Sequence, residues 1–396
     1  MERKLTHIDC FAGPGGICTG LAAAGFDTRV AIDYIKSCCD TYSWNHPDVK
    51  VIHSDIREVQ ENQILPYIPA DGIDLVTSGM PCETFSTAGN TSRSFYDDRQ
   101  FLFREGIRIA KITNAKMILF ENVPAITSKK VSRVDNTLIV DVLKEELRDA
   151  GYTNFIEVVL DATKFGVPQR RNRYFILATR YDDWVLTAPT PSNDTPIVSV
   201  GEALCDLPNV EPNSEVDAKK YLRKASPYTK LMKDLAFWHR EGFDNSLSLQ
   251  TAMKHRASTI KRFSLLREGE GLKDLFERYS DEERERLQKE RILPKKMFIK
   301  RNVRLRLDEP SSTVTSHCLD EFVHPIYDRA LTVRECARLQ SFPDSYFFAG
   351  PFLVPHIDRT VQDKYEQIGD AVPPLLAYAW GCTINNIFAN NGEQDI

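Results

Sequence analysis

The first 180 residues alternate short apolar runs with segments of helical periodicity. The runs are rich in β-branched residues and end in turn residues, which is typical of buried strands. They cover Leu5–Cys10, Thr28–Asp33, Val49–Asp55, Ile73–Gly79, Met117–Val123, Phe155–Leu160 and Arg173–Thr179. Apolar residues at helical spacing predict helices at Gly15–Ala24, Ile35–Asn45, Phe101–Thr113 and Asn136–Ala150. Because strands alternate with helices, the sequence predicts an α/β fold with a parallel sheet covered on both faces.

This pattern changes after Arg180, where five prolines interrupt the chain, at Pro189, Pro191, Pro196, Pro208 and Pro212. A loop-rich stretch of this kind indicates a domain boundary. Helical periodicity returns at Leu331, and we expect a final amphipathic helix, Pro374–Ala389, to pack on the first domain. We therefore predict a large domain at 1–181, a smaller second domain at 182–310, and a return to the first domain at 311–396.

The charge of the chain is divided unevenly along its length. Residues 219–306 hold 24 basic and 12 acidic residues, a balance of +12, although the whole chain carries −5. The rest of the chain then holds 27 basic and 44 acidic residues, a balance of −17. Such asymmetry indicates a polyanionic partner for the basic part. The alternative is a solvated helix face, since Asp281–Arg291 alternates in sign.

Several classes of protein are excluded by what the sequence lacks. No apolar run approaches the roughly 20 residues of a membrane span, and the N-terminus has no pattern of a signal peptide. The nine cysteines form no CxxC motif, so neither a zinc ribbon nor a thioredoxin-type site is predicted, and the eight histidines have no ligand spacing. We expect no metal and a reducing, cytoplasmic environment without a membrane.

Three successive strand ends carry residues suited to a nucleotide. Asp9-Cys-Phe11-Ala-Gly13-Pro14-Gly15-Gly16 follows the first strand, and its glycines allow a tight turn close to a ligand. Asp33 ends the second strand, where a carboxylate can accept from ribose hydroxyls. Asp55 ends the third, in reach of an adenine edge. Either aspartate alone could instead be a helix N-cap, but the set favours an adenosine-containing ligand.

The next strand ends carry reactive groups. Cys82 follows the fourth strand in Gly79-Met-Pro81-Cys82-Glu-Thr-Phe-Ser86, Glu121 ends the fifth, and Gln169-Arg-Arg171-Asn-Arg173 enters the last. A thiolate is a nucleophile, and its addition to C6 of a pyrimidine makes C5 enamine-like. A protonated carboxyl at the ring nitrogen and a guanidinium at the O2 carbonyl would stabilise the developing charge. The alternatives are a buried structural thiol and an ordinary salt bridge.

These segments resemble the ordered motifs of the cytosine-5 DNA methyltransferase family. Beside the four already described, two lie beyond the basic segment: Arg329–Pro343, and Gln367-Ile-Gly369-Asp370-Ala371-Val372-Pro-Pro374. Only 182–308 lacks family pattern, which corresponds to the variable target-recognition region and contains the basic stretch. The resemblance implies a Rossmann-like S-adenosylmethionine-dependent domain and a target-recognition domain. It also implies base flipping of the target cytosine out of duplex DNA.

The resemblance also implies roles for individual residues. Cys82 is the expected nucleophile, Glu121 contacts the N3 and N4 edge, and Arg171 and Arg173 orient the base and the nucleophile. Cofactor contacts are implied for Phe11, Gly13, Pro14, Gly15, Gly16, Asp33, Tyr34, Asp55, Ile56, Pro81, Leu102, Gly369, Asp370, Ala371 and Val372. DNA contacts are expected, from a mobile catalytic loop and from the basic segment, for Ser86, Arg93, Arg99, Arg256, Lys261, Arg262, Lys300, Arg301 and Arg304.

The chain departs from the family at three places. Met80 replaces the first of two prolines, Glu83 replaces a glutamine, and Asp370 replaces an asparagine. None of these changes removes a reacting group. In the motif at Arg329–Pro343, we expect Arg334, Glu335 and Arg338 to organise the two domains rather than to contact substrate.

Four other functions fit the sequence less well. A tRNA cytosine-5 methyltransferase has the same fold, but it typically carries a Cys-Phe-Thr tripeptide that this chain lacks. A catalytically silent DNA-binding subunit would not need Cys82, Glu121 and Arg173 together. An amino-methyltransferase would need a Pro-Pro-Tyr/Phe segment at the fourth strand, and a dehydrogenase would not need Pro81-Cys82. We therefore expect a monomeric prokaryotic enzyme, associated with the nucleoid, whose restriction endonuclease is at most a genetic partner.

Overall fold

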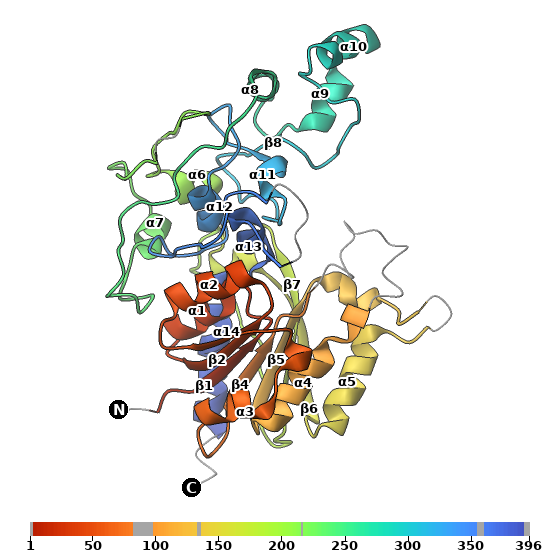
Figure 1. Cartoon of the computed structure of the whole chain (residues 1–396), viewed down its shortest axis with the longest axis vertical. Coiled ribbons are helices and arrows are strands. Elements are labelled where there is room, and N and C mark those ends of the chain that lie inside the picture. The colour runs from red at the N-terminus through yellow and green to blue at the C-terminus, as the bar shows by residue number, and fades with distance from the viewer. Residues whose placement is uncertain (1–2, 82–97, 133–135, 215–216, 355–359, 392–396) are drawn as a thin grey trace.

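The computed structural model describes residues 3–81, 98–132, 136–214, 217–354 and 360–391. A larger lobe contains a central sheet, and a smaller lobe with α8, α9 and α10 stands beyond the edge of the sheet where α13 lies (Figure 1). The sheet has seven strands in the order β3-β2-β1-β4-β5-β7-β6. They are β1 Thr6–Cys10, β2 Asp27–Asp33, β3 Lys50–His53, β4 Leu75–Ser78, β5 Met117–Asn122, β6 Asn154–Asp161 and β7 Asn172–Thr179. The predicted α/β class and each of the seven predicted strands are confirmed.

One feature of the predicted sheet is wrong, because β7 runs antiparallel to both of its neighbours. The connection from β6 to β7 is only residues 162–171 and contains the short 3-10 helix η6 (Ala162–Phe165). A parallel pair needs a crossover of about a dozen residues or more, usually through an α-helix. The short connection therefore forces a reversal of direction, and the start of β7 reaches the edge where the parallel strands end.

Helices cover both faces of the sheet. The alternation of side chains along the strands separates two hydrophobic clusters: Met117 and Leu119 of β5 face one, and Ile118 and Phe120 face the other. The first face is covered by α1 (Gly16–Ala23), α2 (Lys36–Asn45) and α14 (Pro374–Asn391). The second is covered by α3 (Glu61–Ile64), α4 (Phe103–Ile112) and α5 (Ile139–Asp149). Burial of both faces explains the near-continuous apolar runs in the sequence.

The final helix packs on the first domain as predicted, and glycines allow it to approach closely. A Cβ on Gly20 of α1 would lie 2.2 Å from the carbonyl oxygen of Pro374, and one on Gly381 would lie 2.5 Å from Ala24 Cβ. The first turns of α14 are buried nearly all round, from Pro374 to Ala377. This helix is therefore less amphipathic than the sequence suggested.

The remaining elements lie between β7 and α14. They are α6 Val200–Leu204, α7 Pro227–Met232, α8 Ala257–Ser264, α9 Leu272–Arg278, α10 Asp281–Lys289, β8 Val303–Arg304, α11 Cys318–Glu321, β9 Phe322–Val323, α12 Val333–Leu339 and α13 Lys364–Asp370. Short 3-10 helices occur at η1 Ile56–Glu58, η2 Leu65–Tyr67, η4 Asp98–Phe101 and η5 Pro124–Ser128. Within the described ranges, no helix has the length and apolar character needed to cross a bilayer.

The predicted second domain, 182–310, is larger than the segment that has a hydrophobic cluster of its own. Trp184, Tyr228 and Trp238 belong to the cluster that also contains α1 and α14. A separate, small cluster begins only at Phe263 and extends to Leu293, with Val323 packed into it. Residues from about 256 to 304 therefore form the smaller lobe, and the residues before them belong to the main body.

Helix α12 and the residues beside it are tied to the segment 182–250 through buried charges and polar bonds. Arg329 forms a two-pronged ion pair with Glu335 at 2.8 Å, and Arg338 pairs with Asp344 and, at 3.1 Å, with Asp206. Arg334 donates to the carbonyl oxygens of neighbouring loops. All of these side chains are buried and bonded to protein groups, which confirms the expected structural role of Arg334, Glu335 and Arg338.

The close packing of α1 on α14 predicts a stability effect at Gly20. Replacing Gly20 by Ala should lower the free energy of unfolding by about 1–3 kcal/mol, because the added Cβ meets backbone rather than a flexible side chain. Gly242→Ala is the matched control, since its Cβ would enter open space. Denaturant unfolding followed by circular dichroism measures both, and equal midpoints for the two variants would contradict the packing described here.

Candidate functional site

A cavity of about 340 Å³ lies at the carboxyl ends of β1, β2, β4 and β5. It brings together residues from the Gly-rich turn, two later strand ends and the turn after α13, which are far apart in the sequence. Thirteen of the fifteen predicted cofactor residues line it: Phe11, Gly13, Pro14, Gly16, Asp33, Tyr34, Asp55, Ile56, Pro81, Leu102, Asp370, Ala371 and Val372. Its volume falls in the range of about 300–1,000 Å³ that is usual for small-molecule sites.

The Gly-rich turn forms one wall through an unusual backbone. Phe11, Gly13 and Gly15 have φ values of 57°, 54° and 94°, in the left-handed region. Such a conformation is sterically costly for Phe11, and strained residues of this kind concentrate at functional sites. The turn is held from behind by Tyr346, whose hydroxyl donates to the carbonyl oxygen of Pro14 at 2.5 Å. The packing around the turn therefore fixes the shape of the cavity wall.

Asp33 is oriented by the backbone of the turn itself. One carboxylate oxygen accepts from the amide of Gly13, and the other accepts from the amide of Ile35, both at 2.8 Å. Burial raises the pKa of Asp33, while these amide donors act in the opposite direction. The carboxylate is thus fixed at the cavity wall with lone pairs left to accept from hydroxyl groups of a ligand.

Asp55 has both of the roles that the sequence left open. Its side chain caps η1 by accepting from the amide of Arg57, and it also pairs with the guanidinium of Arg57 at 2.5 Å. The hydrogen bond from Arg57 lowers the pKa of Asp55. Both residues line the cavity, so the cap also positions a charged pair at its mouth.

The turn after α13 closes the cavity on another side. Gln362 joins this turn to α2, because its amide donates to Asp370 at 2.9 Å and its oxygen accepts from the thiol of Cys38 at 3.1 Å. An aspartate at position 370, where the family has asparagine, is therefore an acceptor for Gln362. Sequence analysis missed Gln362, because nothing in its local pattern distinguishes it.

Two predicted cofactor glycines do not line the cavity. A Cβ on Gly369 would lie 2.1 Å from the backbone of Thr315, and one on Gly15 would lie 2.7 Å from the hydroxyl of Tyr346. Both positions therefore require glycine for close packing, and they act on the cavity only by shaping its walls.

Arg171 also lies outside the cavity, although it was predicted beside the reacting groups. Its guanidinium is buried and donates to the carbonyl oxygens of Val314 at 2.7 Å, Gly369 at 2.9 Å and Ala371 at 3.0 Å. It thus ties the start of β7 to the turn that closes the cavity. This geometry is that of a positioning residue.

Arg173 and Glu121, in contrast, meet within the cavity. Arg173 Nε lies 2.7 Å from a carboxylate oxygen of Glu121, and both side chains are only about a tenth exposed. They come from the adjacent, antiparallel strands β7 and β5. The pair provides an acidic and a basic group that face one ligand from the same wall.

The segment before Cys82 is tied to the same strand. Asn122, next to Glu121, donates from its amide to the carbonyl oxygen of Met80 at 3.3 Å, and Pro81 lines the cavity. Cys82 itself, with Ser86 and Arg93, lies outside the described residues. The local sequence around Asn122 gives no sign of this bond to Met80.

The other cysteine at the cavity is a poor nucleophile. Cys38 lines the wall, but burial and the nearby carboxylate of Asp33 hold the pKa of its thiol well above the usual range. Burial likewise raises the pKa of Cys18, behind the Gly-rich turn, to about 12. A thiolate forms far less readily at these positions than at an ordinary cysteine.

The predicted DNA-contacting residues divide into two groups. Arg99 lines the cavity, and Arg256, Lys261, Lys300 and Arg301 are exposed on the smaller lobe. The guanidinium groups of Arg304 and Arg262 are instead bonded within the protein. Arg304 is buried and donates to four backbone carbonyl oxygens, among them that of Phe263 at 2.7 Å. Arg262 is bonded to Ile292 and Asn302. The guanidinium groups of both residues thus bond to backbone and side-chain groups of the protein itself, and a DNA contact by either residue stays a prediction.

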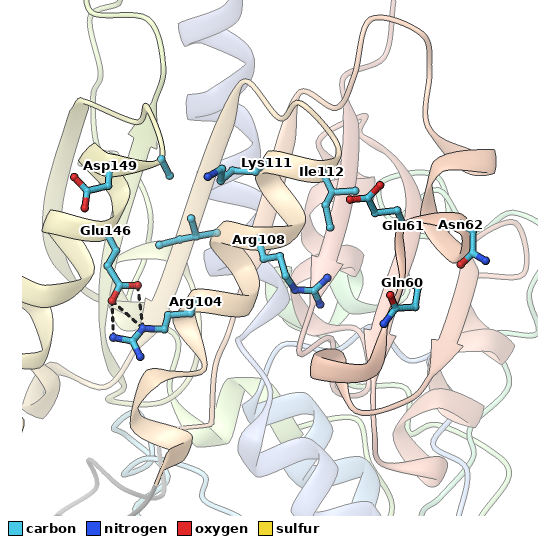
Figure 2. Close-up of a pocket in the computed structure, with 11 residues that line it drawn as sticks. Gln60, Glu61, Asn62, Arg104, Arg108, Lys111, Ile112, Glu146 and Asp149 are labelled. Carbon is cyan, nitrogen blue, oxygen red and sulfur yellow. Dashed lines mark hydrogen bonds and ion pairs between the residues drawn. The ribbon is translucent and has the colours of Figure 1, made fainter.

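A larger depression, of about 990 Å³, lies between α3, α4 and α5, away from the strand ends (Figure 2). Arg104 there pairs with Glu146, and Arg108 donates to the carbonyl oxygens of Ile56 and Val59. Its principal cations are already bonded within the protein, so we do not place the site there. In the described part of the chain, no three His, Cys, Asp or Glu side chains gather as a metal site would require.

Comparison with known proteins agrees with this geometry. The family model for the C-5 cytosine-specific DNA methylase matches residues 5–386. The type II methyltransferase M.DdeI of Desulfomicrobium norvegicum is 32% identical over 97% of this chain and 89% of its own length. M1.HphI of Haemophilus parahaemolyticus is 31% identical over 95% of this chain and 85% of its own.

Solved structures are similar in fold. A prophage-encoded Escherichia coli chain described as a DNA modification methyltransferase superposes with a TM-score of 0.73 at 23% identity, covering 98% of this chain and 100% of its own. The Dnmt2 methyltransferase of S. pombe superposes with a TM-score of 0.55 at 17% identity, covering 97% and 99%. At these identities the likeness concerns the fold alone.

The bonds of Arg171 predict a large effect on stability. Arg171→Ala should lower the free energy of unfolding by about 3 kcal/mol or more, because it leaves three buried carbonyl oxygens without a charged donor. The neighbouring Arg170 is exposed and pairs with Glu309 at the surface, so Arg170→Ala should cost less than about 1 kcal/mol. Urea unfolding of both variants tests the difference, and similar losses would refute the clamping role.

Proposed function

The chain belongs to the family of C-5 cytosine-specific DNA methylases, and on that premise we propose which of its residues carry out the reaction. It is a DNA cytosine-5 methyltransferase, and S-adenosylmethionine is its methyl donor. The observation that carries the assignment of residues is the single cavity. It joins the nucleotide-binding strand ends to the Glu121–Arg173 pair and to Pro81, which directly precedes Cys82.

The cavity suits the cofactor. Asp33 presents a carboxylate held by two backbone amides, which fits a pair of ribose hydroxyls, and Asp55 with Ile56 borders the place for an adenine. A Cβ at Gly13 would meet no atom within 4 Å, so this position opens on space a ligand can occupy. When bound, the cofactor supplies an electrophilic methyl group on a sulfonium sulfur.

The reaction begins at Cys82. Its thiolate adds to C6 of a cytosine that has been flipped out of the duplex, which forms a carbon–sulfur bond and makes C5 nucleophilic. The carboxyl of Glu121 contacts N3 and the exocyclic amine, and Arg173, already paired with it, holds its orientation and contacts the O2 side. With the cofactor bound, its methyl group would pass to C5 and leave the neutral thioether. Loss of the C5 proton to a base and departure of the Cys82 thiolate would then restore the ring double bond.

The smaller lobe supplies DNA recognition. Residues 182–310, and within them the lobe from about 256 to 304, hold the exposed cations Arg256, Lys261, Lys300 and Arg301 that suit phosphate or base contact. The relatives are type II methyltransferases, so we infer that a restriction endonuclease of the same specificity is a genetic partner. By the same inference the enzyme acts as a monomer in the bacterial cytoplasm, at the nucleoid.

A methylation map tests the function and reveals the target. The protein is expressed in a bacterial host without its own 5-methylcytosine, beside its Cys82→Ala variant, and every cytosine is read genome-wide. We expect nearly every copy of one short sequence to carry 5-methylcytosine with the wild type and none with Cys82→Ala. Methylation by the variant would refute Cys82 as the nucleophile. If the wild-type protein is folded but the DNA stays unmodified, the proposed DNA substrate is wrong, and tRNA becomes the substrate to test.

The role of Glu121 is tested by removing its carboxyl group while keeping its shape. Glu121→Gln should lower kcat by about 100-fold or more, because the amide cannot share a proton with the ring nitrogen. Binding of S-adenosylmethionine should change less than twofold, since an amide oxygen can still accept from Arg173.

A glutamate of the same sheet provides the control. Glu157 on β6 is paired with Lys144, away from the cavity, so Glu157→Gln should leave kcat within about twofold of the wild type. Single-turnover methylation of the mapped target and calorimetry with the cofactor give the two quantities. A near-normal rate for Glu121→Gln would overturn its assignment.

A further inference from the structure

The smaller lobe exposes three consecutive apolar side chains. Met297, Phe298 and Ile299 are 46%, 40% and 68% exposed, although the same lobe buries other apolar residues in its own cluster. They lie in the loop that joins α10 to β8 on the outer side of the lobe (Figure 1). Scattered exposed apolar residues are ordinary, but a contiguous group in a small lobe indicates a binding surface.

Both ends of this loop are fixed. Ile292 and Leu293 before it are buried, and so are Asn302 and Arg304 after it. The guanidinium of Arg262 joins the two ends, because it donates to the carbonyl oxygen of Ile292 and to the side-chain oxygen of Asn302. The loop is therefore a projection from a pinned base. Arg262 thus supports the exposed loop by holding its two ends together.

Positive charge surrounds the apolar group. Lys295 and Lys296 precede it and Lys300 and Arg301 follow it, all exposed. The sequence has no Asp or Glu between Arg291 and Leu307. Arg301 lies over the ring of Phe298, 4.6 Å from its centroid, and 3.6 Å from the carboxylate of Asp320, so the ring is held in a set direction.

This combination fits one partner. An apolar protein surface would leave Lys295, Lys296 and Lys300 without counter-charges, whereas duplex DNA offers phosphates beside apolar base faces and thymine methyl groups. Met, Phe and Ile are side chains that enter base steps as wedges in other DNA-binding proteins. Resting on the function proposed above, we propose that Met297, Phe298 and Ile299 form the apolar base-contacting surface of this enzyme, with the flanking cations on the phosphates.

The salt dependence of binding separates the two parts of this surface. Phe298→Ala should weaken binding to the mapped target duplex by about tenfold, the size of effect that loss of an aromatic contact with a base has elsewhere. It should leave the slope of log Kd against log salt unchanged, because no counterion is involved. Lys300→Ala should reduce that slope by about 0.9.

Matched controls guard against general effects. Val185→Ala removes a similarly exposed apolar group that follows β7 on the larger lobe, and should not change DNA affinity. Lys273→Ala removes an exposed cation of α9 that is paired with Glu277, and should leave the salt slope unchanged. Fluorescence anisotropy with labelled duplex at several salt concentrations measures all variants. Unfolding midpoints and cofactor affinity establish that each variant is intact.

The outcomes are distinct. If Phe298→Ala and the triple alanine variant at 297–299 bind the target like Val185→Ala, the inference is overturned. It is likewise overturned if the triple variant abolishes self-association, seen by sedimentation, without changing DNA affinity, because the surface would then serve a second copy of the chain. The proposed function is judged separately, by whether the wild type methylates the target at all.

Discussion

A single buried guanidinium joins the parts of this enzyme that the chain order separates. Arg171 stands at the start of β7 and donates to carbonyl oxygens at Val314, Gly369 and Ala371. After β7 the chain leaves the sheet, forms the smaller lobe and returns only near residue 311. Together with the bonds that Gln362 makes to Asp370 and Cys38, this connection holds the turn that closes the cavity against the sheet. The antiparallel direction of β7 is what brings Arg171 to that edge.

The chemistry of the site depends on the same strand. Two residues beyond Arg171, the side chain of Arg173 meets Glu121 on the adjacent strand β5. A pair with little exposure keeps both groups oriented before substrate enters, so little reorganisation is needed when charge develops on the base. The cavity wall is fixed in the same way, by Tyr346 behind the Gly-rich turn and by amides that hold Asp33. The groups that line the cavity are therefore held in place by hydrogen bonds, and they come from segments that are far apart in the sequence.

The smaller lobe is held together in a different way from the site. Residues 256–304 hold 15 basic and nine acidic side chains and only a small apolar cluster, which is too little to hold the loops by packing alone. Arg262 and Arg304 instead bond to its carbonyl oxygens and cross-link its loops. The apolar side chains at 297–299 stay exposed although the core of the lobe is small, as the DNA-contacting surface proposed above requires.

The sequence by itself determined the seven strands, the α/β class and the order of the motifs, because strand and helix periodicity and turn residues are local signals. Strand order also brings Phe11, Asp33 and Asp55 to one sheet edge, since the carboxyl ends of parallel strands meet there, whereas the other predicted cofactor residues at the cavity were implied by the family resemblance. Only the tertiary structure decided the direction of β7, the clamp made by Arg171 and the part of Gln362 at the cavity. It also decided which arginines of the basic segment face solvent. The last three features depend on contacts between residues more than a hundred positions apart or on the packing of irregular loops, and no periodic pattern encodes them. The direction of β7 follows from the short connection after β6, which strand periodicity alone does not reveal.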